Sequence, residues 1–171
     1  MNQINYRSLC VMLVDDDPVQ RAVVKAMLKK LGTWQIFESD NGHDAEPLIK
    51  VAEPDLLICD VAMEPVNGFE LLRRLRTMQS AKLRQIPVIM LSGLSASGTV
   101  MKASVLEADA YVVKPIVADI QSDRISRVMR TPNGSAFRID RSHLSDNKPS
   151  LDSPTVEDKH FKSRSALKEA V

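Results

Sequence analysis

Five short apolar runs, each followed by a helical or polar stretch, constrain this fold more than any other feature of the chain. They are SLCVMLV from Ser8, WQIFES from Trp34, DLLIC from Asp55, PVIML from Pro87 and AYVV from Ala110. Strands buried on both faces have continuous runs of this kind, and strands that alternate with helices form a parallel sheet through right-handed crossovers. The sequence therefore predicts an α/β, doubly wound fold with helices on both faces of the sheet.

The first helix is the most clearly marked. Asp17 is placed to cap it rather than to bind a metal, Pro18 occupies its first position, and Gly32 stops it. Apolar residues at helical spacing predict one buried face. The residues expected on that face are Val19, Ala22, Val23, Ala26, Met27 and Leu31.

The third helix is expected from Gly68 to about Gln79, with three arginines, Arg73, Arg74 and Arg76, pointing outward. They could form a nucleic-acid patch, but a surface helix needs charged residues opposite its apolar face in any case. The formal net charge of +1 gives no electrostatic case for nucleic acid or an acidic membrane. We therefore interpret the arginines as a solvated face and expect no nucleic-acid partner.

The composition changes after Arg130. Residues 131–154 contain turn formers, serines and prolines with few apolar residues, which is typical of a linker. Thr155 and Asp158 form an imperfect capping box for a short, marginal helix near the end. We expect a domain at residues 7–130 and a mostly irregular tail at 131–171, with little room for a separate DNA-binding domain.

The first residues, MNQINYRS, contain no basic region followed by a long apolar one, and no later apolar run is long enough to span a bilayer. The sequence predicts a cytoplasmic protein with no membrane insertion. Cys10 and Cys59 fit this location, because both fall within predicted buried strands and two cysteines make no disulfide framework. We expect both to be reduced core thiols.

Charged and hydroxyl side chains stand at the ends of four predicted strands. Asp15 and Asp16 follow the first strand, Asp60 follows the third, Ser92 the fourth and Lys114 the fifth. The carboxyl ends of parallel strands lie along one edge of the sheet, where such folds bind ligands. Neighbouring carboxylates form a hard oxygen site suited to Mg²⁺. The sequence therefore predicts one shared site with a magnesium cofactor.

These groups have a joint chemical use. When Mg²⁺ and Lys114 neutralise the charge on a phosphoryl group, Asp60 can attack it as a nucleophile and form an acyl phosphate. The hydroxyl of Ser92 can donate to a phosphate oxygen held at Asp60, and so can sense whether the group is present. The residues therefore predict a phosphoryl-accepting site.

Four segments, VMLVDDDP, LLICDVAMEPVNGFELL, PVIMLSG and ADAYVVKP, resemble the two-component response regulator receiver (CheY-like) family over about residues 7 to 130. The resemblance implies a flavodoxin-like, five-stranded parallel sheet in the order 2-1-3-4-5. It implies that Asp60 accepts a phosphoryl group from a sensor histidine kinase or a histidine phosphotransfer protein. It also implies that Asp15, Asp16, Asp60 and the backbone carbonyl of Ala62 bind Mg²⁺.

The same resemblance assigns the other site residues. Lys114 pairs with the phosphoryl group, Ser92 moves to bond it, and Tyr111 is the aromatic switch whose rotamer follows Ser92. A tyrosine in a strand is more often a packing residue, but the place of Tyr111 three residues before Lys114 favours the switch role. The family also suggests a cis peptide between Lys114 and Pro115.

Several positions depart from the family pattern. Glu64 precedes Pro65 where the loop after the phosphoacceptor normally has its proline, so the loop is expected to be shaped differently. Glu107 stands where a helix-ending glycine is usual. Pro47 falls inside the expected second helix, and a proline is tolerated only in the first turn, so this helix is expected to start near Asp44.

We interpret the chain as a phosphorylation-dependent signalling switch without a DNA-binding output domain. The family's switch surface corresponds to about Ala96 to Arg130, which would dock a downstream target or a second copy of the chain. A phosphorelay intermediate, carrier or sink, is an alternative, as is a pseudo-receiver that acts only as a scaffold. A Mg²⁺-dependent phosphohydrolase of the haloacid dehalogenase type is a further alternative, but it would need an aspartate in place of Ala62. We therefore expect no enzyme activity beyond autodephosphorylation. We expect autodephosphorylation to be slow, because Leu94 shields the phosphoryl group from water.

Overall fold

A six-stranded parallel sheet forms the centre of the molecule. In this computed structural model, the described residues are 5–93, 103, 106–114, 125, 127–129 and 139–140. The strands are β1 (Cys10–Val14), β2 (Gln35–Ser39), β3 (Leu56–Asp60), β4 (Val88–Ser92), β5 (Ala110–Val113) and β6 (Ile139–Asp140). Their order across the sheet is β2-β1-β3-β4-β5-β6, which confirms the predicted order of the first five strands. The sixth strand was not predicted, and it comes from the segment that we expected to be an irregular tail.

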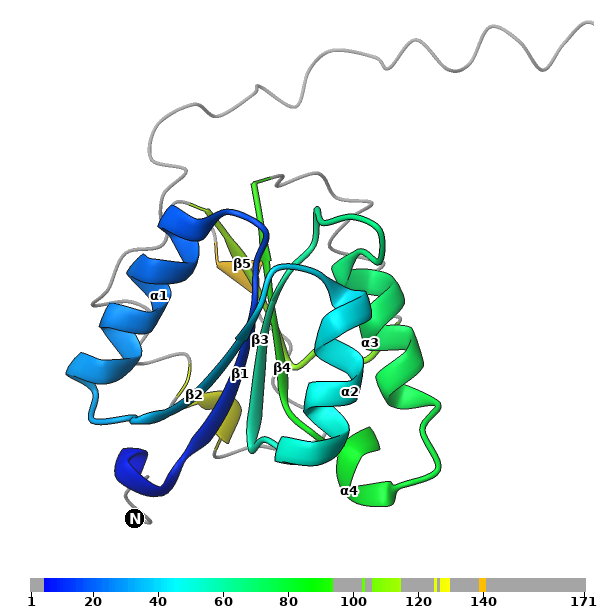
Figure 1. The fold of residues 1–171 in the computed structure, drawn as a ribbon, viewed down its shortest axis with the longest axis horizontal. Helices are drawn as coiled ribbons and strands as arrows, with labels where there is room; N and C mark the ends of the chain where they lie inside the picture. The colour runs from blue at the N-terminus through cyan, green and yellow to red at the C-terminus, as the bar shows by residue number, and fades with distance from the viewer. Residues whose placement is uncertain are drawn as a thin grey trace, which may run out of the picture.

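The helices cover both faces of the sheet, as predicted. They are α1 (Pro18–Lys30), α2 (Gly42–Ala52), α3 (Gly68–Arg76) and a short α4 (Ala81–Arg84), after a 3-10 turn η1 (Tyr6–Ser8). Figure 1 shows α1 on one face and α2 and α3 on the other. The third helix is shorter than predicted, because the chain turns at Thr77 and forms α4 before β4. No helix in the described part of the chain is long and apolar enough to cross a bilayer.

Two apolar cores lie on opposite faces of the sheet. Met12, Val14 and Leu57 pack on one face with residues of α2 and α3, and Leu13 and Ile58 pack on the other with residues of α1. Every residue of β3 and β4 is buried, which is why the sequence reads as continuous apolar runs there. Both cysteines are free; one is buried as predicted, and the other is only partly buried.

The cap of α1 was predicted correctly, but of its predicted buried face only Met27 is buried and Leu31 partly buried. Asp17 accepts hydrogen bonds from the backbone N–H groups of Val19 and Gln20. The side chains that α1 buries are Val24, Met27 and Leu28. Of the residues expected inside, Val19 is 69% exposed and Val23 49% exposed, and Ala22 and Ala26 are also exposed. The helix has two overlapping apolar stripes. The one that packs against the sheet contains Val24, Met27 and Leu28.

The second helix begins two residues earlier than predicted, at Gly42. Asn41 caps it by accepting a hydrogen bond from the backbone N–H of Asp44, and the N–H of Gly42 donates to the carbonyl of Val66. A Cβ atom at Gly42 would lie 2.7 Å from that carbonyl oxygen, so the close approach requires glycine. Pro47 therefore lies inside the helix, where it removes one backbone hydrogen bond.

The arginines of α3 do not all belong to a solvated face. Arg73 and Arg74 form surface ion pairs with Glu70, as the prediction implies. The side chain of Arg76 is only 14% exposed, which contradicts the prediction. Its guanidinium donates to the carbonyl oxygens of Arg84, Ile86 and Glu107 and to the carboxylate of Asp109. Arg76 therefore joins α3 to the segments that lead into β4 and β5.

Candidate functional site

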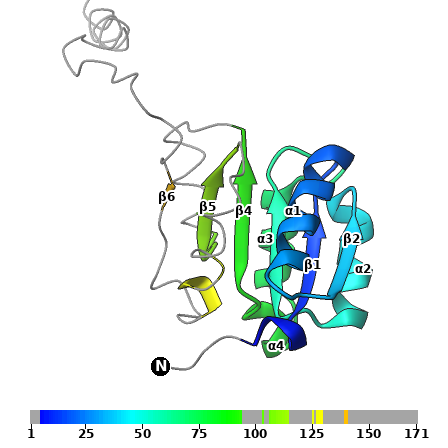
Figure 2. The ribbon, with the colours of Figure 1, turned by 90° about the vertical axis from the view of Figure 1, so that its left-hand side faces the viewer.

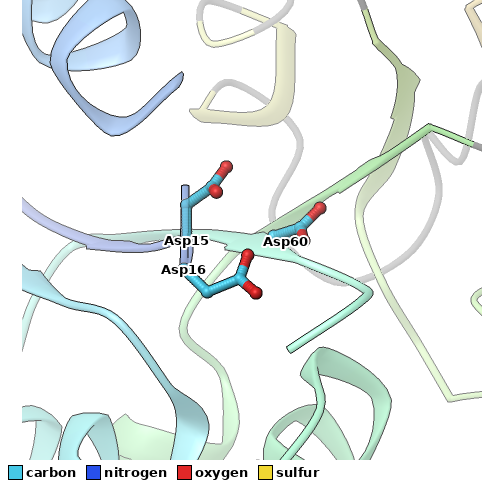
Figure 3. A group of neighbouring side chains, drawn as sticks. All are labelled: Asp15, Asp16 and Asp60. Carbon is cyan, nitrogen blue, oxygen red and sulfur yellow. The ribbon is translucent and has the colours of Figure 1, made fainter. Parts of the chain in front are cut away.

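Three carboxylates meet at the carboxyl ends of β1 and β3. Asp15 and Asp16 follow β1, and Asp60 is the last residue of β3. An oxygen atom from each of the three side chains lies within 4.8 Å of the others (Figure 3). Asp15 and Asp60 are buried, whereas Asp16 is exposed. The sequence correctly predicted that these groups would come together, and the exposure of Asp16 leaves one side of the cluster open to solvent.

The backbone and side chain of Asp15 are held by four hydrogen bonds. Its N–H donates to the carbonyl of Ser39 on β2, and its own carbonyl accepts from Arg21 Nη1 at 2.6 Å. Its Oδ1 accepts from the backbone N–H of Asp17 at 2.9 Å, and its Oδ2 from Lys114 Nζ at 3.0 Å. Arg21 was not predicted as a site residue, because it belongs to no motif and donates to a backbone atom six residues away.

Lys114 bridges the two buried carboxylates. Its Nζ lies 3.0 Å from Asp15 Oδ2 and 2.9 Å from Asp60 Oδ1, and its backbone N–H donates to the carbonyl of Ser92 at 2.8 Å. Burial alone would lower the pKa of Lys114, but the hydrogen bonds to Asp60 and Asp15 outweigh it, so the pKa is raised. The ammonium group is therefore charged at neutral pH and aimed at the space beside Asp60.

Asp60 lies in a partly desolvated position. Burial raises its pKa, although Lys114 and a 3.2 Å hydrogen bond from the backbone N–H of Ala62 to Oδ2 act in the opposite direction. The thiol of Cys59 points to the backbone carbonyl of Asp60, and burial raises the pKa of this thiol as well. Cys59 therefore stays protonated at neutral pH.

The loop after β3 is held close to Asp60 by a glycine. Gly68 N–H donates to the carbonyl of Val61 at 3.1 Å, and a Cβ atom at Gly68 would lie 2.1 Å from the carbonyl oxygen of Asp60. No side chain could occupy that position without moving the backbone. The loop also contains a cis peptide between Glu64 and Pro65, and Glu64 is exposed. That the loop differs in shape from the family's stays a prediction.

Ser92 and Tyr111, the expected switch pair, lie on the neighbouring strands β4 and β5. Both side chains are buried, and Tyr111 is completely inaccessible to solvent. Burial raises the pKa of Tyr111, and a side-chain hydrogen bond with Ser92 opposes that rise. The tyrosine is therefore a neutral phenol that points inward. Its switch role stays a prediction.

Some predicted features lie outside the described residues. They are the peptide bond between Lys114 and Pro115, the shielding residue Leu94, and most of the surface from Ala96 to Arg130. Within the described part, Glu107 has φ 60°, the left-handed backbone for which glycine is usual at this position. Glu107, which replaces the usual glycine, therefore has a strained backbone conformation.

The donors at this site fit a hard divalent cation. Mg²⁺ prefers one or two carboxylates together with waters and phosphate oxygens, and Asp15, Asp16 and Asp60 offer carboxylates only, with no histidine or thiol among them. The open side at Asp16 leaves room for waters and for an incoming phosphoryl group. Lys114 supplies a positive charge in contact with Oδ1 of Asp60.

Comparisons with known proteins agree with this geometry. The family model described as the response regulator receiver domain matches residues 11–125. The chain is 29% identical over 124 residues to the chemotaxis protein CheY of Pseudomonas aeruginosa, covering 72% of this chain and 98% of that protein. It is 32% identical over 147 residues to the cell cycle transcriptional regulator CtrA of Caulobacter vibrioides, covering 86% of this chain and 61% of CtrA.

A solved structure has the same fold. It is the receiver domain of a sensor histidine kinase from Pseudomonas aeruginosa, with a magnesium ion coordinated in its active site cleft. It matches with a TM-score of 0.65 and 22% identity, covering 72% of this chain and 98% of that one. At this identity the likeness concerns the fold alone.

Proposed function

Because the chain belongs to the family of response regulator receiver domains, we propose that it is a phosphorylation-dependent switch in which Asp60 accepts the phosphoryl group. The observation that carries this proposal is the position of Lys114, whose ammonium group touches both Asp15 and Asp60. Receiver domains are phosphoacceptor signalling domains and in general are not enzymes. The donor we propose is a phosphohistidine on a sensor kinase or on a histidine phosphotransfer protein.

The carboxylates would hold Mg²⁺ through Asp15, Asp16 and Asp60, with the backbone carbonyl of Ala62 as a further ligand. When bound, the ion supplies positive charge that offsets the negative charges of the carboxylate and the phosphoryl group. Support for this ligand set comes from the 4.8 Å cluster and from its all-oxygen donors. The exposed Asp16 gives solvent and donor access to that side of Asp60.

In the transfer step, a carboxylate oxygen of Asp60 forms a bond to phosphorus while the bond from phosphorus to the donor's imidazole nitrogen breaks. The imidazole keeps the electron pair of the broken bond and takes up a proton. Asp60 becomes an acyl phosphate. Lys114 remains beside it and pairs with a phosphoryl oxygen, which requires only that the ammonium shift from the carboxylate to the new group.

The response to phosphorylation would begin at Ser92. Its hydroxyl donates to a phosphoryl oxygen at Asp60 and gives up its hydrogen bond with Tyr111. A buried hydroxyl without a partner is costly, so Tyr111 must find another partner or another position. We propose that this rearrangement changes how β5 and its neighbours bind a partner, and that partner binding is the output.

The exposed apolar residues of α1 give the phosphodonor a docking face. Val19 lies next to the cap residue Asp17, close in sequence to the metal-binding carboxylates, and Val23 follows one turn later. Both are exposed, although they are large aliphatic side chains. A donor that covered them with an apolar helix would bring its histidine to the open side of the site.

Phosphorylation by a small donor tests the central claim. The protein is incubated with acetyl phosphate with and without Mg²⁺, and intact mass reports the added phosphoryl group. We expect labelling of wild type only with Mg²⁺, and no labelling of Asp60→Asn. Asp17→Asn is the matched control, because it makes the same change of charge two residues from Asp15 and keeps a good helix cap. Labelling of Asp60→Asn at the wild-type level would contradict the proposal.

A further inference from the structure

The outer edge of β5 is occupied by a segment from the chain's own tail. β6 runs parallel to β5, with Ile139 opposite Tyr111 and Asp140 opposite Val112. Figure 2 shows β6 beside β5, at the opposite end of the sheet from β2. The strand that contains the switch tyrosine therefore lies between β4 on one side and the tail on the other.

The connection to β6 is built into the core. Parallel neighbours need a crossover of a dozen or more residues, and 25 residues lie between Val113 and Ile139 (114 to 138). Within that crossover, Ile125 and Val128 are helical and buried in the same apolar core as the residues of α1. These two residues of the crossover are therefore anchored in the core, and β6 follows them at the edge of the sheet.

β5 is connected to the phosphorylation site at two points. Tyr111 is bonded to Ser92, and Lys114, just after the strand, bridges Asp15 and Asp60. In the arrangement that holds β6, Oδ1 of Asp60 contacts Lys114. In the proposed function, the bond between Tyr111 and Ser92 and the contact between Lys114 and Asp60 both rearrange when a phosphoryl group is attached to Asp60. One of them originates at the residue directly opposite Ile139.

We propose that the edge of β5 is a docking site for residues 139–140 of the tail, and that phosphorylation of Asp60 weakens this docking. The inference rests on the proposed function and extends it, because it names the segment that responds. A pairing of two residues is a weak interaction, so a modest change at Tyr111 is enough to shift it. Release would expose the backbone of β5 to a partner strand and would free the tail.

Hydrogen exchange of the full chain tests the docking directly. Beryllium trifluoride with Mg²⁺ serves as the probe, because it mimics a phosphoryl group on a carboxylate. We expect the amide within residues 139–140 that pairs with β5 to be protected without the probe and to exchange about five-fold or more faster with it, since couplings between sites are typically of this size. The amides of β1 and β3 should stay protected in both conditions.

A pair of proline variants tests the coupling in the reverse direction. Successive N–H groups of a strand point to opposite sides, so Ile139→Pro with Asp140→Pro removes whichever N–H pairs with β5. Because coupling is reciprocal, this variant should bind beryllium trifluoride more tightly by the factor seen in exchange. Ser145→Pro with Asp146→Pro is the control, since it adds the same prolines and removes the same charge outside the paired segment.

Two outcomes would overturn the inference, and they are distinguishable. If beryllium trifluoride binds and exchange at residues 139–140 does not change, or if the Ile139→Pro with Asp140→Pro variant binds it no more tightly than the control, the coupling is wrong while the proposed function stands. If neither beryllium trifluoride nor acetyl phosphate reacts at Asp60, the proposed function fails, and this inference fails with it. Fluorine NMR of the bound probe separates the two cases.

Discussion

The ammonium nitrogen of Lys114 lies 2.9 Å from Oδ1 of Asp60, and the same nitrogen lies 3.0 Å from Oδ2 of Asp15. One positive charge thus serves two buried carboxylates. Burial raises the pKa of Asp60 in spite of the lysine, and the negative charge of Asp15 adds to that rise. It also means that the residue that we propose to be the phosphoacceptor lowers the stability of the fold.

We therefore expect Asp60→Asn to unfold at a higher temperature than wild type at neutral pH. An acidic group with a raised folded pKa binds more protons in the folded state, so stability falls as the pH rises from the unfolded pKa, about 3.9, through the folded pKa. The gain of Asp60→Asn over wild type should appear in that window and stay constant above it. Thermal unfolding of both proteins across pH measures it, and a gain that does not vary with pH would refute this account.

Arg76 is expected to be essential for stability but not for phosphorylation. Replacing it with alanine removes the ion-pair partner of the buried Asp109, which keeps a hydrogen bond from the backbone N–H of Val88, and the Arg76 donors to three backbone carbonyls. The loss should cost about 3 kcal/mol of unfolding free energy. Arg73→Ala on the same helix removes only a surface ion pair and should cost less than about 1 kcal/mol. Denaturant unfolding compares the two variants.

Acetyl phosphate labelling of Arg76→Ala below its melting temperature should match wild type. A variant that folds normally but cannot be labelled would show that Arg76 belongs to the site. Equal stability losses for Arg73→Ala and Arg76→Ala would show that both arginines lie on the solvated face that the sequence suggested.

The strands and the site were predictable from sequence for the same reason. Strands buried on both faces of a parallel sheet are apolar, so a polar or charged residue that ends an apolar run can be recognised in the sequence. The parallel topology then brings the ends of these strands to one edge of the sheet. Asp15, Asp60 and Lys114 could therefore be placed together without a structure. Arg21 and Gly68 could not, because their roles depend on the path of the backbone in the loops.

Other predictions were wrong because the sequence pattern is compatible with two different arrangements. The first helix has two overlapping apolar stripes, and only its packing decides that Val24 and Leu28 are inside and Val19 outside. In the sequence, Arg76 cannot be distinguished from Arg73 and Arg74. Only the fold shows that four hydrogen-bond acceptors surround its guanidinium. β6 has two residues and no periodicity, so its pairing with β5 depends on a distant crossover.

Glu107 offers a stabilising substitution. Its φ of 60° is the left-handed region, which costs a residue with a Cβ atom about 1 kcal/mol relative to glycine. Its backbone carbonyl accepts from Arg76, and that bond needs no side chain. Glu107→Gly should therefore raise the unfolding free energy by about 1 kcal/mol. Glu107→Ala removes the same carboxylate and keeps the Cβ atom, so an equal gain from alanine would rule out relief of backbone strain.

The exposed face of α1 predicts a difference between protein donors and small donors. Val19→Glu and Val23→Glu each place a charge where we propose that an apolar donor helix docks. Transfer from a phosphorylated histidine phosphotransfer protein should therefore slow about ten-fold, which corresponds to about 1.4 kcal/mol in the free energy of the transition state. Labelling by acetyl phosphate should change less than about two-fold, because the small donor does not use this face. Val51→Glu, on the exposed side of α2 and 86% exposed in wild type, is the control. If all three variants retain wild-type transfer from the protein donor, the donor docks elsewhere; if all three slow it equally, the effect is one of net charge.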